Sequence, residues 1–220
     1  QDNVASSNVA VGSAALEENT TGTRNVAVGR AALENNTTGN YNVAVGYVVL
    51  NNNNGSYNVG VGYEALKQCT TGQQNIGMGV NAGTAITTGD YNVAIGPNAL
   101  MAATTGDNTV SVGRNSLINC TTGNHNTAVG GSACLYGLTT GTYNSAFGVD
   151  AGQNISTGSN TTLIGYQAGT SSGAGGVLVT ESNRIVLGNS SVTNFTAQVA
   201  LTVASDERDK TDITTFTKGL

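Results

Sequence analysis

A short motif recurs through most of this chain at nearly constant spacing. Asn-Val-Ala-Val-Gly, first seen at 8–12, returns in identical or similar form about every 17 residues. Of the nine steps between successive motif glycines, seven are 17 residues long, one is 16 and one is 18. A fixed period of this length predicts a stack of like units, because a single globular core imposes no such repeat. The motif glycines are Gly12, Gly29, Gly46, Gly62, Gly79, Gly96, Gly113, Gly130, Gly148 and Gly165.

Each repeat has the pattern expected of one coil of a β-solenoid. In residues 25–41, Val26 and Val28 alternate with small or polar residues, which is typical of a strand with one buried face. We expect the valines on that buried face. A glycine then allows a bend, a shorter apolar segment ends at Leu33, and an Asn-Asn-Thr-Thr-Gly run has the residues of a turn. The repeat therefore predicts a strand, a corner, a second short strand and a return loop.

Stacking of coils is needed to cover the valines of each repeat. About ten coils at a spacing of ~4.8 Å would form a body about 50 Å long, and the segments between glycines are too short for stable helices. The small residue before each leucine position favours close packing against another surface. One thin coil per chain provides little core, so we expect several chains to associate around a common axis. Stacking would also align a ladder of asparagines at Asn8, Asn25, Asn42, Asn58, Asn75, Asn92, Asn126 and Asn144.

Composition limits the partners of the chain. It contains 31 Gly and no Trp, only 10% of its residues are charged, and its net charge is −5. Regularly spaced Val, Ile and Thr favour an ordered repeat over disorder. No segment approaches the ~20 apolar residues of a membrane span. The absence of any Lys/Arg cluster argues against nucleic acid or an anionic membrane as partner.

Three cysteines are too few for a disulfide framework. Cys69 and Cys120 lie three repeats apart, which would separate them by about 14 Å in the stack, beyond the ~7 Å limit for bridged Cα atoms. Cys134 falls where other repeats have leucine. We expect all three to be small apolar fillers of the core.

The repeats resemble those of known fibre proteins. Residues 42–47 and 63–72 look like the head repeats of trimeric autotransporter adhesins, and still more like the longer-period version in phage tail fibres and related bacterial surface proteins. This resemblance covers residues 8–169. It implies a left-handed parallel β-roll with three chains side by side, on a virion-borne or extracellular fibre. Residues 1–169 would form this β-roll domain.

The remaining residues predict two further segments. Residues 170–204 begin Ser/Gly-rich and continue with two alternating stretches, as expected of a linker and β-stalk. Residues 205–213, Ser-Asp-Glu-Arg-Asp-Lys-Thr-Asp-Ile, are similar to the opening of the endosialidase-type intramolecular chaperone domain. That resemblance implies a module that helps three chains trimerise and then cuts itself off, with Ser205 as nucleophile and Lys210 as its base. Because the chain stops at Leu220, we expect 205–220 to be a truncated start of this domain and the pair to be silent.

These observations favour a structural homotrimeric fibre segment that attaches to a host cell surface, in a virion tail fibre or at a cell surface. The alternative is an adhesin or filament protein of non-viral origin. An ice-binding solenoid is disfavoured because the recurrent Thr-Thr pairs have adjacent side chains that point in opposite directions. Since they precede a turn glycine, we expect them to bond their own backbone in loops.

Nothing in the sequence indicates an enzyme, a cofactor or a metal site. The carboxylates are scattered instead of paired, and they do not recur as in calcium-binding β-rolls. His125 stands where other repeats have tyrosine, and we expect an exposed ring there. The tyrosines could contact host glycans, or they could cover the edges of the coils. These tyrosines are Tyr41, Tyr57, Tyr91 and Tyr143.

Overall fold

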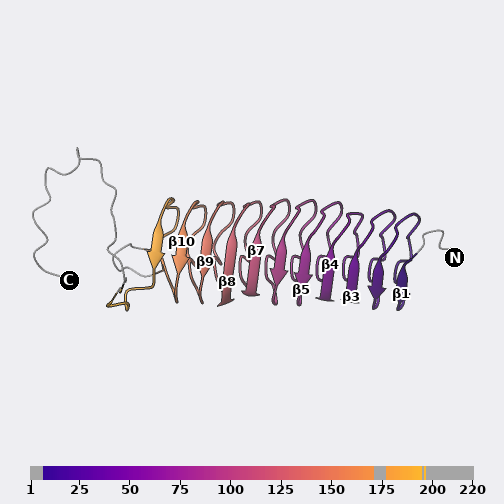
Figure 1. The fold of residues 1–220 in the computed structure, drawn as a ribbon, viewed down its shortest axis with the longest axis horizontal. Helices are drawn as coiled ribbons and strands as arrows, with labels where there is room; N and C mark the ends of the chain where they lie inside the picture. The colour runs from indigo at the N-terminus through magenta and orange to yellow at the C-terminus, as the bar shows by residue number, and fades with distance from the viewer. Residues whose placement is uncertain (1–6, 171–176, 195, 197–220) are drawn as a thin grey trace, which may run out of the picture.

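The computed structural model describes residues 7–170, 177–194 and 196, which form an elongated all-β solenoid (Figure 1). Eleven short strands lie side by side in one parallel sheet, and their order in space follows their order in sequence. The all-β solenoid predicted from the repeat is therefore confirmed. The strands are β1 (Val9–Val11), β2 (Val26–Val28), β3 (Val43–Tyr47), β4 (Val59–Tyr63), β5 (Ile76–Met78), β6 (Val93–Ile95), β7 (Val110–Arg114), β8 (Thr127–Ser132), β9 (Ser145–Phe147), β10 (Thr162–Ile164) and β11 (Ile185–Leu187).

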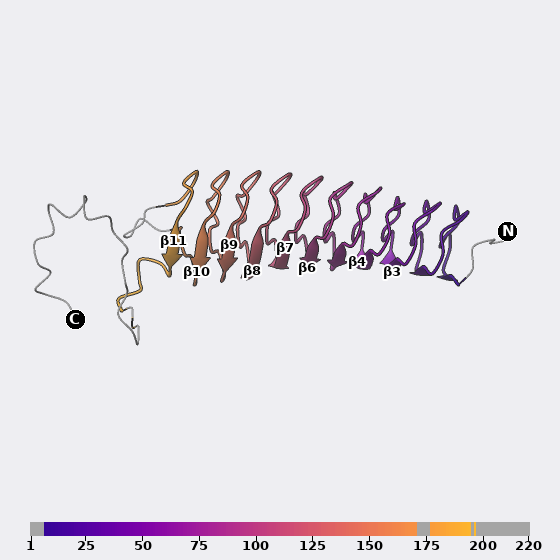
Figure 2. The same ribbon diagram turned by 45° about the horizontal axis from the view of Figure 1, so that its top comes forward.

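Each coil contains one strand, and the predicted second strand is wrong. After the strand the chain makes a series of turns, in which Ala31 and Leu33 have left-handed φ angles of 54° and 52°. This reversal sends successive N–H groups to different neighbours: the Ala31 N–H bonds Ser13 O in the preceding coil at 2.9 Å, and the Leu33 N–H bonds Val49 O in the following coil at 3.1 Å. The turn segment thus pairs with both neighbouring coils without becoming extended. The loops all project to one side of the sheet (Figure 2).

The motif glycines form a column in which a side chain has no room. Gly46 pairs with Gly62 across β3 and β4, and its φ is 132°. A Cβ on Gly46 would lie 1.9 Å from the Gly62 carbonyl oxygen. Close backbone contact between coils therefore requires glycine here.

The face of each strand that is buried is the opposite of the one predicted. Ala27 and Ala44 are fully buried, whereas Val26, Val28 and Val43 are only half-buried and Val45 is exposed. The coil is narrow, so the central, inward position of each strand holds alanine, glycine or serine, apart from the leucine at 163 and the valine at 186 near the end of the sheet. The valines consequently point out from the sheet.

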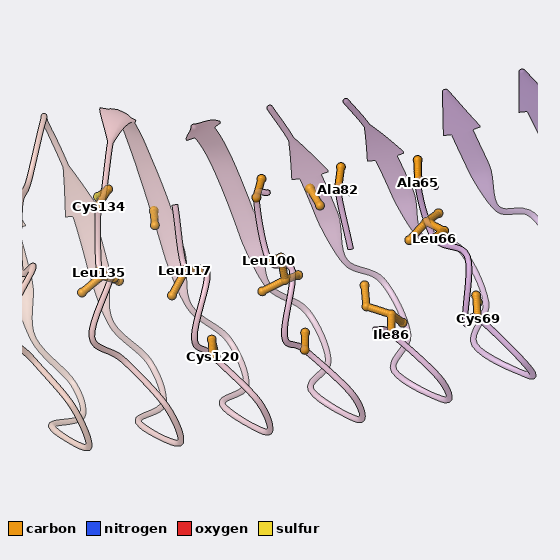
Figure 3. Packing of buried hydrophobic residues seen from close by; sticks show 14 of the residues in the cluster. Ala65, Leu66, Cys69, Ala82, Ile86, Leu100, Leu117, Cys120, Cys134 and Leu135 are labelled. Atoms are coloured by element: carbon orange, nitrogen blue, oxygen red, sulfur yellow. The ribbon is translucent and has the colours of Figure 1, made fainter. Parts of the chain in front are cut away.

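Two rows of side chains from the turn segment fill the interior. Ala65 and Leu66 are both fully buried, so the small residues before the leucines face inward and not toward another surface. Cys69 and Cys120 lie in a further buried row with Ile86 (Figure 3). Both thiols are free and buried, as predicted.

The position predicted for Cys134 is wrong by one residue. Leu135 takes the leucine position, and Cys134, also a free buried thiol, takes the small-residue position beside it (Figure 3). The shift arises because this coil has an extra residue: the register between β7 and β8 moves so that Arg114 pairs with Ser132. The extra residue at the end of the strand thus shifts the alignment of this repeat with the others by one position, while the packing of the coil interior stays the same.

The asparagine ladder is confirmed, although its bonds mostly join side chain to backbone. The Asn42 N–H donates to Asn25 Oδ1 at 2.9 Å, and Asn42 Nδ2 donates to the Gly55 carbonyl oxygen at 2.9 Å. The prediction that the Thr-Thr pairs bond their own backbone is wrong, because the first hydroxyl of the pair bonds the next coil: Thr87 Oγ1 donates to Thr104 O at 3.0 Å. Polar groups at the coil edges therefore bind neighbouring coils together.

The described part of the predicted linker and stalk continues the same sheet. Ile185 pairs with Thr162, and Leu187 pairs with Ile164, in parallel register between β10 and β11. Ser205, Lys210 and the rest of the predicted chaperone start lie outside the described residues. Within the described ranges, no helix has the length and apolar character of a membrane span.

Candidate interaction surface

The outward side of the sheet carries two central rows of mostly apolar side chains, interrupted only by hydroxyl residues at 127, 145 and 162, which we call the valine face. No charged residue interrupts these rows, and their exposed members range from Val45 at 36% to Ile185 at 76%. Large contiguous apolar surfaces of this kind mark interaction sites. The valine face consists of Val9, Val11, Val26, Val28, Val43, Val45, Val59, Val61, Ile76, Met78, Val93, Ile95, Val110, Val112, Thr127, Val129, Ser145, Phe147, Thr162, Ile164, Ile185 and Leu187.

Mostly polar and aromatic side chains border the valine face on both sides. The entry row is the residue before each motif asparagine or its equivalent, and the exit row is the residue after each motif glycine. The entry row is Ser7, Arg24, Tyr41, Tyr57, Gln74, Tyr91, Asn108, His125, Tyr143, Asn160 and Asn183. The exit row is Ser13, Arg30, Tyr47, Tyr63, Val80, Pro97, Arg114, Ser132, Val149, Tyr166 and Asn189, with Ser132 placed by its pairing with Arg114.

Stacked aromatic rings fix parts of the entry row. Tyr41 and Tyr57 have ring centroids 4.8 Å apart and planes within 7°. The Arg24 guanidinium carbon lies 5.0 Å from the Tyr41 ring centroid, and Arg24 donates a hydrogen bond to the Tyr41 hydroxyl. Further along, His125 stacks on Tyr143 with centroids 4.9 Å apart.

The exit row repeats this arrangement across the sheet. Tyr47 and Tyr63 have ring centroids 5.1 Å apart and planes within 8°. The Arg30 guanidinium carbon lies 5.4 Å from the Tyr47 centroid, and Arg30 Nη1 donates to the Tyr47 hydroxyl at 2.7 Å. Cation–π contacts and ring stacking thus hold the Arg30, Tyr47 and Tyr63 part of the exit row in place, as they hold the matching part of the entry row.

The four tyrosines predicted as glycan contacts all lie in the entry row, and only two of them are neighbours. Arg24 and Tyr57 occupy the two faces of the Tyr41 ring, so a sugar would meet the edge of that ring and its hydroxyl. Glycan contact stays a prediction. The sequence prediction missed the exit tyrosines, although their fixed place after the motif glycine was a usable signal.

The described residues contain no cluster of three or more His, Cys, Asp or Glu side chains able to hold a metal ion. Burial raises the pKa of the Cys69 thiol to about 12 and that of Cys120 to about 11, so neither is a thiolate near neutral pH. Glu64 forms an ion pair with Lys67 at 3.1 Å.

Comparison of the chain with protein-family models, characterised proteins and solved structures found no match. The valine face and its two border rows therefore carry the functional inference.

Proposed function

We propose that this chain is a structural segment of a homotrimeric fibre, either a tail fibre or a surface adhesin, that forms an elongated body for attachment to a host cell. The observation that carries this proposal is the uncharged valine face, which extends from β1 to β11. A fibre segment of this kind would act on a virion or at a cell surface.

The exposed side of the sheet is unusual for its type. Parallel sheets occur almost only where both of their faces are covered. Here the turn segments cover one face, with Ala44 and Leu50 fully buried, while Val45 on the other face is exposed. A copy of the same chain offers an equally apolar and equally long surface to cover it.

The size of the face suits a stable assembly. Eleven strands at ~4.8 Å spacing give a length of about 50 Å, and the six residue steps from the entry row to the exit row give a width of about 20 Å. The product is about 1,000 Å² per chain, which a trimer shares between two neighbours, compared with roughly 800 Å² per partner in a standard two-chain interface.

Size-exclusion chromatography with light scattering tests the stoichiometry. We expect a mass of about three times the 22.1 kDa of one chain, with small-angle scattering typical of a rod. A folded monomer at micromolar concentration would contradict the proposal. Attachment is tested separately by the binding of labelled protein to a glycan array and to a panel of bacterial cells, and failure to bind either would count against it.

A further inference from the structure

One return loop differs from the others because its coil is one residue short. The step from Gly46 to Gly62 is 16 residues, compared with 17 in most coils. Asn53 Nδ2 donates to Gly55 O at 2.9 Å, as the asparagine of the preceding coil does to its own turn glycine, so Asn54 alone takes the place of the threonine pair. Asn54 is also the only asparagine in the sequence that is followed by glycine.

The side chain of Asn54 replaces a backbone carbonyl oxygen of the regular coils. In a regular coil, the Thr70 N–H and the Thr70 hydroxyl donate to Thr87 O at 2.9 and 3.0 Å. At the short coil, the Thr37 N–H and the Thr37 hydroxyl donate to Asn54 Oδ1 at 2.8 and 2.7 Å. The Thr38 N–H is a third donor to the same oxygen, at 3.1 Å. The preceding coil therefore holds three donors around one side-chain amide oxygen.

Three donors around a carbonyl oxygen have the arrangement of an oxyanion hole. Such donors stabilise the negative charge that develops on the oxygen when a nucleophile attacks the carbonyl carbon. The nucleophile within reach is the Gly55 backbone nitrogen, because its attack on Asn54 Cγ closes a five-membered ring within the chain. Gly55 has no side chain to hinder the attack, and among the hydrogen bonds of the described residues none has the Gly55 N–H as its donor. Asn54 is exposed, so water can reach its side chain and ammonia can leave.

We propose that Asn54 is a site of self-modification, at which the chain converts its own asparagine to an acidic residue. Gly55 N bonds to Asn54 Cγ, the bond from Cγ to Nδ2 breaks, and Nδ2 leaves as ammonia with the proton that Gly55 N loses. One water molecule then opens the ring: attack at Cγ gives aspartate, and attack at the main-chain carbonyl carbon gives isoaspartate. The net reaction exchanges an amide for a carboxylate, without oxidation or reduction. This inference goes beyond the proposed function and does not depend on it.

The fold favours aspartate as the product. Its carboxylate would keep an oxygen within reach of the same three donors, and hydrogen bonds to a charged acceptor are stronger than those to an amide. Isoaspartate would instead lengthen the main chain by one carbon atom. The Asn54 N–H is held by Thr70 O at 2.6 Å and Gly55 O by Asn42 Nδ2 at 2.9 Å, so the extra atom would strain these bonds. Each modified chain gains a negative charge on the loop side, and the share of modified chains rises with the age of the protein.

Peptide mass spectrometry of the full chain tests the proposal. Trypsin cleaves after Arg30 and Lys67 and releases residues 31–67, in which fragmentation locates the mass gain of an amide-to-acid conversion. During incubation at mildly alkaline pH, we expect Asn54 to convert roughly 10-fold faster in the folded chain than in a synthetic peptide of residues 48–61, less than in a buried enzyme site because the loop is solvated. The folded chain should also give the larger share of aspartate. Asn54→Gln, which would need a six-membered ring, should stay unmodified, and a sample without incubation gives the background.

Variants of the donors separate an oxyanion effect from the flexibility of the loop. Thr37→Val removes the hydroxyl donor and should slow the conversion roughly 3- to 10-fold, the effect of one exposed hydrogen bond. Thr37→Ser keeps the hydroxyl and should react at the wild-type rate. Thr104→Val is the matched control: it removes the equivalent bond between two other coils, from Thr104 Oγ1 to Thr121 O at 3.2 Å, and should also react at the wild-type rate. Circular dichroism before incubation checks that each variant is folded.

Three outcomes would overturn this inference. A conversion no faster in the folded chain than in the peptide would mean that the fold does not promote the reaction. Equal rates for Thr37→Val and Thr37→Ser would show that the hydroxyl takes no part in it. Cleavage of the chain between Asn54 and Gly55 would show that Nδ2 is the nucleophile instead of the Gly55 nitrogen. None of these outcomes bears on the association of chains, so the proposed function is tested separately.

Discussion

A single asparagine joins neighbouring coils at the start of most strands. Its side-chain oxygen accepts the backbone N–H of the next asparagine, while its side-chain nitrogen donates to a turn carbonyl oxygen: Asn58 Oδ1 accepts from Asn75 N, and Asn58 Nδ2 donates to Gly72 O. These groups are buried, so loss of a bond would leave them unpaired at a cost of about 1–3 kcal/mol. This requirement explains why asparagine recurs at this position.

The ladder is incomplete at Thr109. The Thr109 N–H donates to Asn92 Oδ1 at 3.0 Å, and its hydroxyl donates to the Gly123 carbonyl oxygen at 3.4 Å. Among the hydrogen bonds of the described residues, none joins Thr109 to the Asn126 N–H. The threonine hydroxyl can both donate and accept, as the asparagine amide can, but here it lies within bonding distance of the Asp107 and Gly123 carbonyl oxygens and makes no bond to the Asn126 N–H.

Thr109→Asn should therefore stabilise the protein. The restored acceptor would contribute about 0.5–1.5 kcal/mol per chain, which calorimetry should record as a melting temperature a few degrees higher. Thr109→Val, which keeps the shape but removes the hydroxyl, should lower the melting temperature. If Thr109→Asn melts below the wild type, the ladder does not control stability at this strand.

The buried thiols predict a pH dependence with a definite sign. Burial is the main cause that raises the pKa of Cys69 to about 12 and of Cys120 to about 11, whereas an unfolded thiol titrates near ~8.5. The folded state keeps the thiol protons up to a higher pH than the unfolded state does. The stability that the raised pKa contributes is therefore complete below pH ~8.5 and is lost as the pH rises toward 11–12. Urea unfolding from pH 8 to pH 10.5 should thus show a steeper loss of stability in the wild type than in Cys69→Ala/Cys120→Ala. Equal slopes would show that the thiols are accessible in the folded chain.

At the scale of the coil, the sequence predicted the repeat but not which face of each strand points into the interior. Alternation shows that Val26 and Ala27 lie on opposite faces, and it does not show which face is inside. The size of the interior decides this: Ala27 shares one buried cluster with Ala32 and Leu33 of the turn segment, and the narrow space favours alanine over valine. The turn segment was also mistaken for a strand, because left-handed residues such as Ala31 and Leu33 have no signature in their side chains.

One pair of residues shows how neighbouring coils adjust to each other. In most coils alanine stands both before the leucine and at the inward position of the strand. In one coil Val49 replaces the alanine before the leucine, and in the following coil Gly60 replaces the alanine of the strand. A Cβ on Gly60 would lie 2.4 Å from Val49 Cγ1. The larger side chain in one coil is therefore matched by a missing side chain in the next.

Val49→Ala and Gly60→Ala should rescue each other. Gly60→Ala alone should destabilise the chain by about 1–3 kcal/mol through overpacking, and Val49→Ala alone by about 1.6 kcal/mol through lost apolar burial. The double variant restores the alanine pair of other coils, so chemical denaturation should show a favourable coupling of at least ~0.5 kcal/mol. Strictly additive effects would mean that the two side chains do not share one space.

For the whole molecule, stability is a sum over neighbouring coils, because each coil contacts only the coils before and after it. That property made the fold predictable from the period alone. The surface was less predictable: the entry tyrosines were recognised as a row, but their relation to Tyr47 and Tyr63 depends on which way the strand faces. The number of chains cannot follow from one chain's periodicity, since it depends on how the valine faces meet.

Val45→Asp tests whether the valine face is needed for the folding of a single chain or for the association of several chains. Val45 is exposed in the single chain, so an aspartate there stays hydrated and the coil should keep its β-type circular dichroism. In the assembly the same charge would be buried against apolar neighbours at a cost of several kcal/mol, so light scattering should show a monomer. Thr122→Asp, which adds the same charge on the exposed loop side, is the matched control and should remain assembled. If Val45→Asp assembles as well as this control does, the valine face is not where the chains meet.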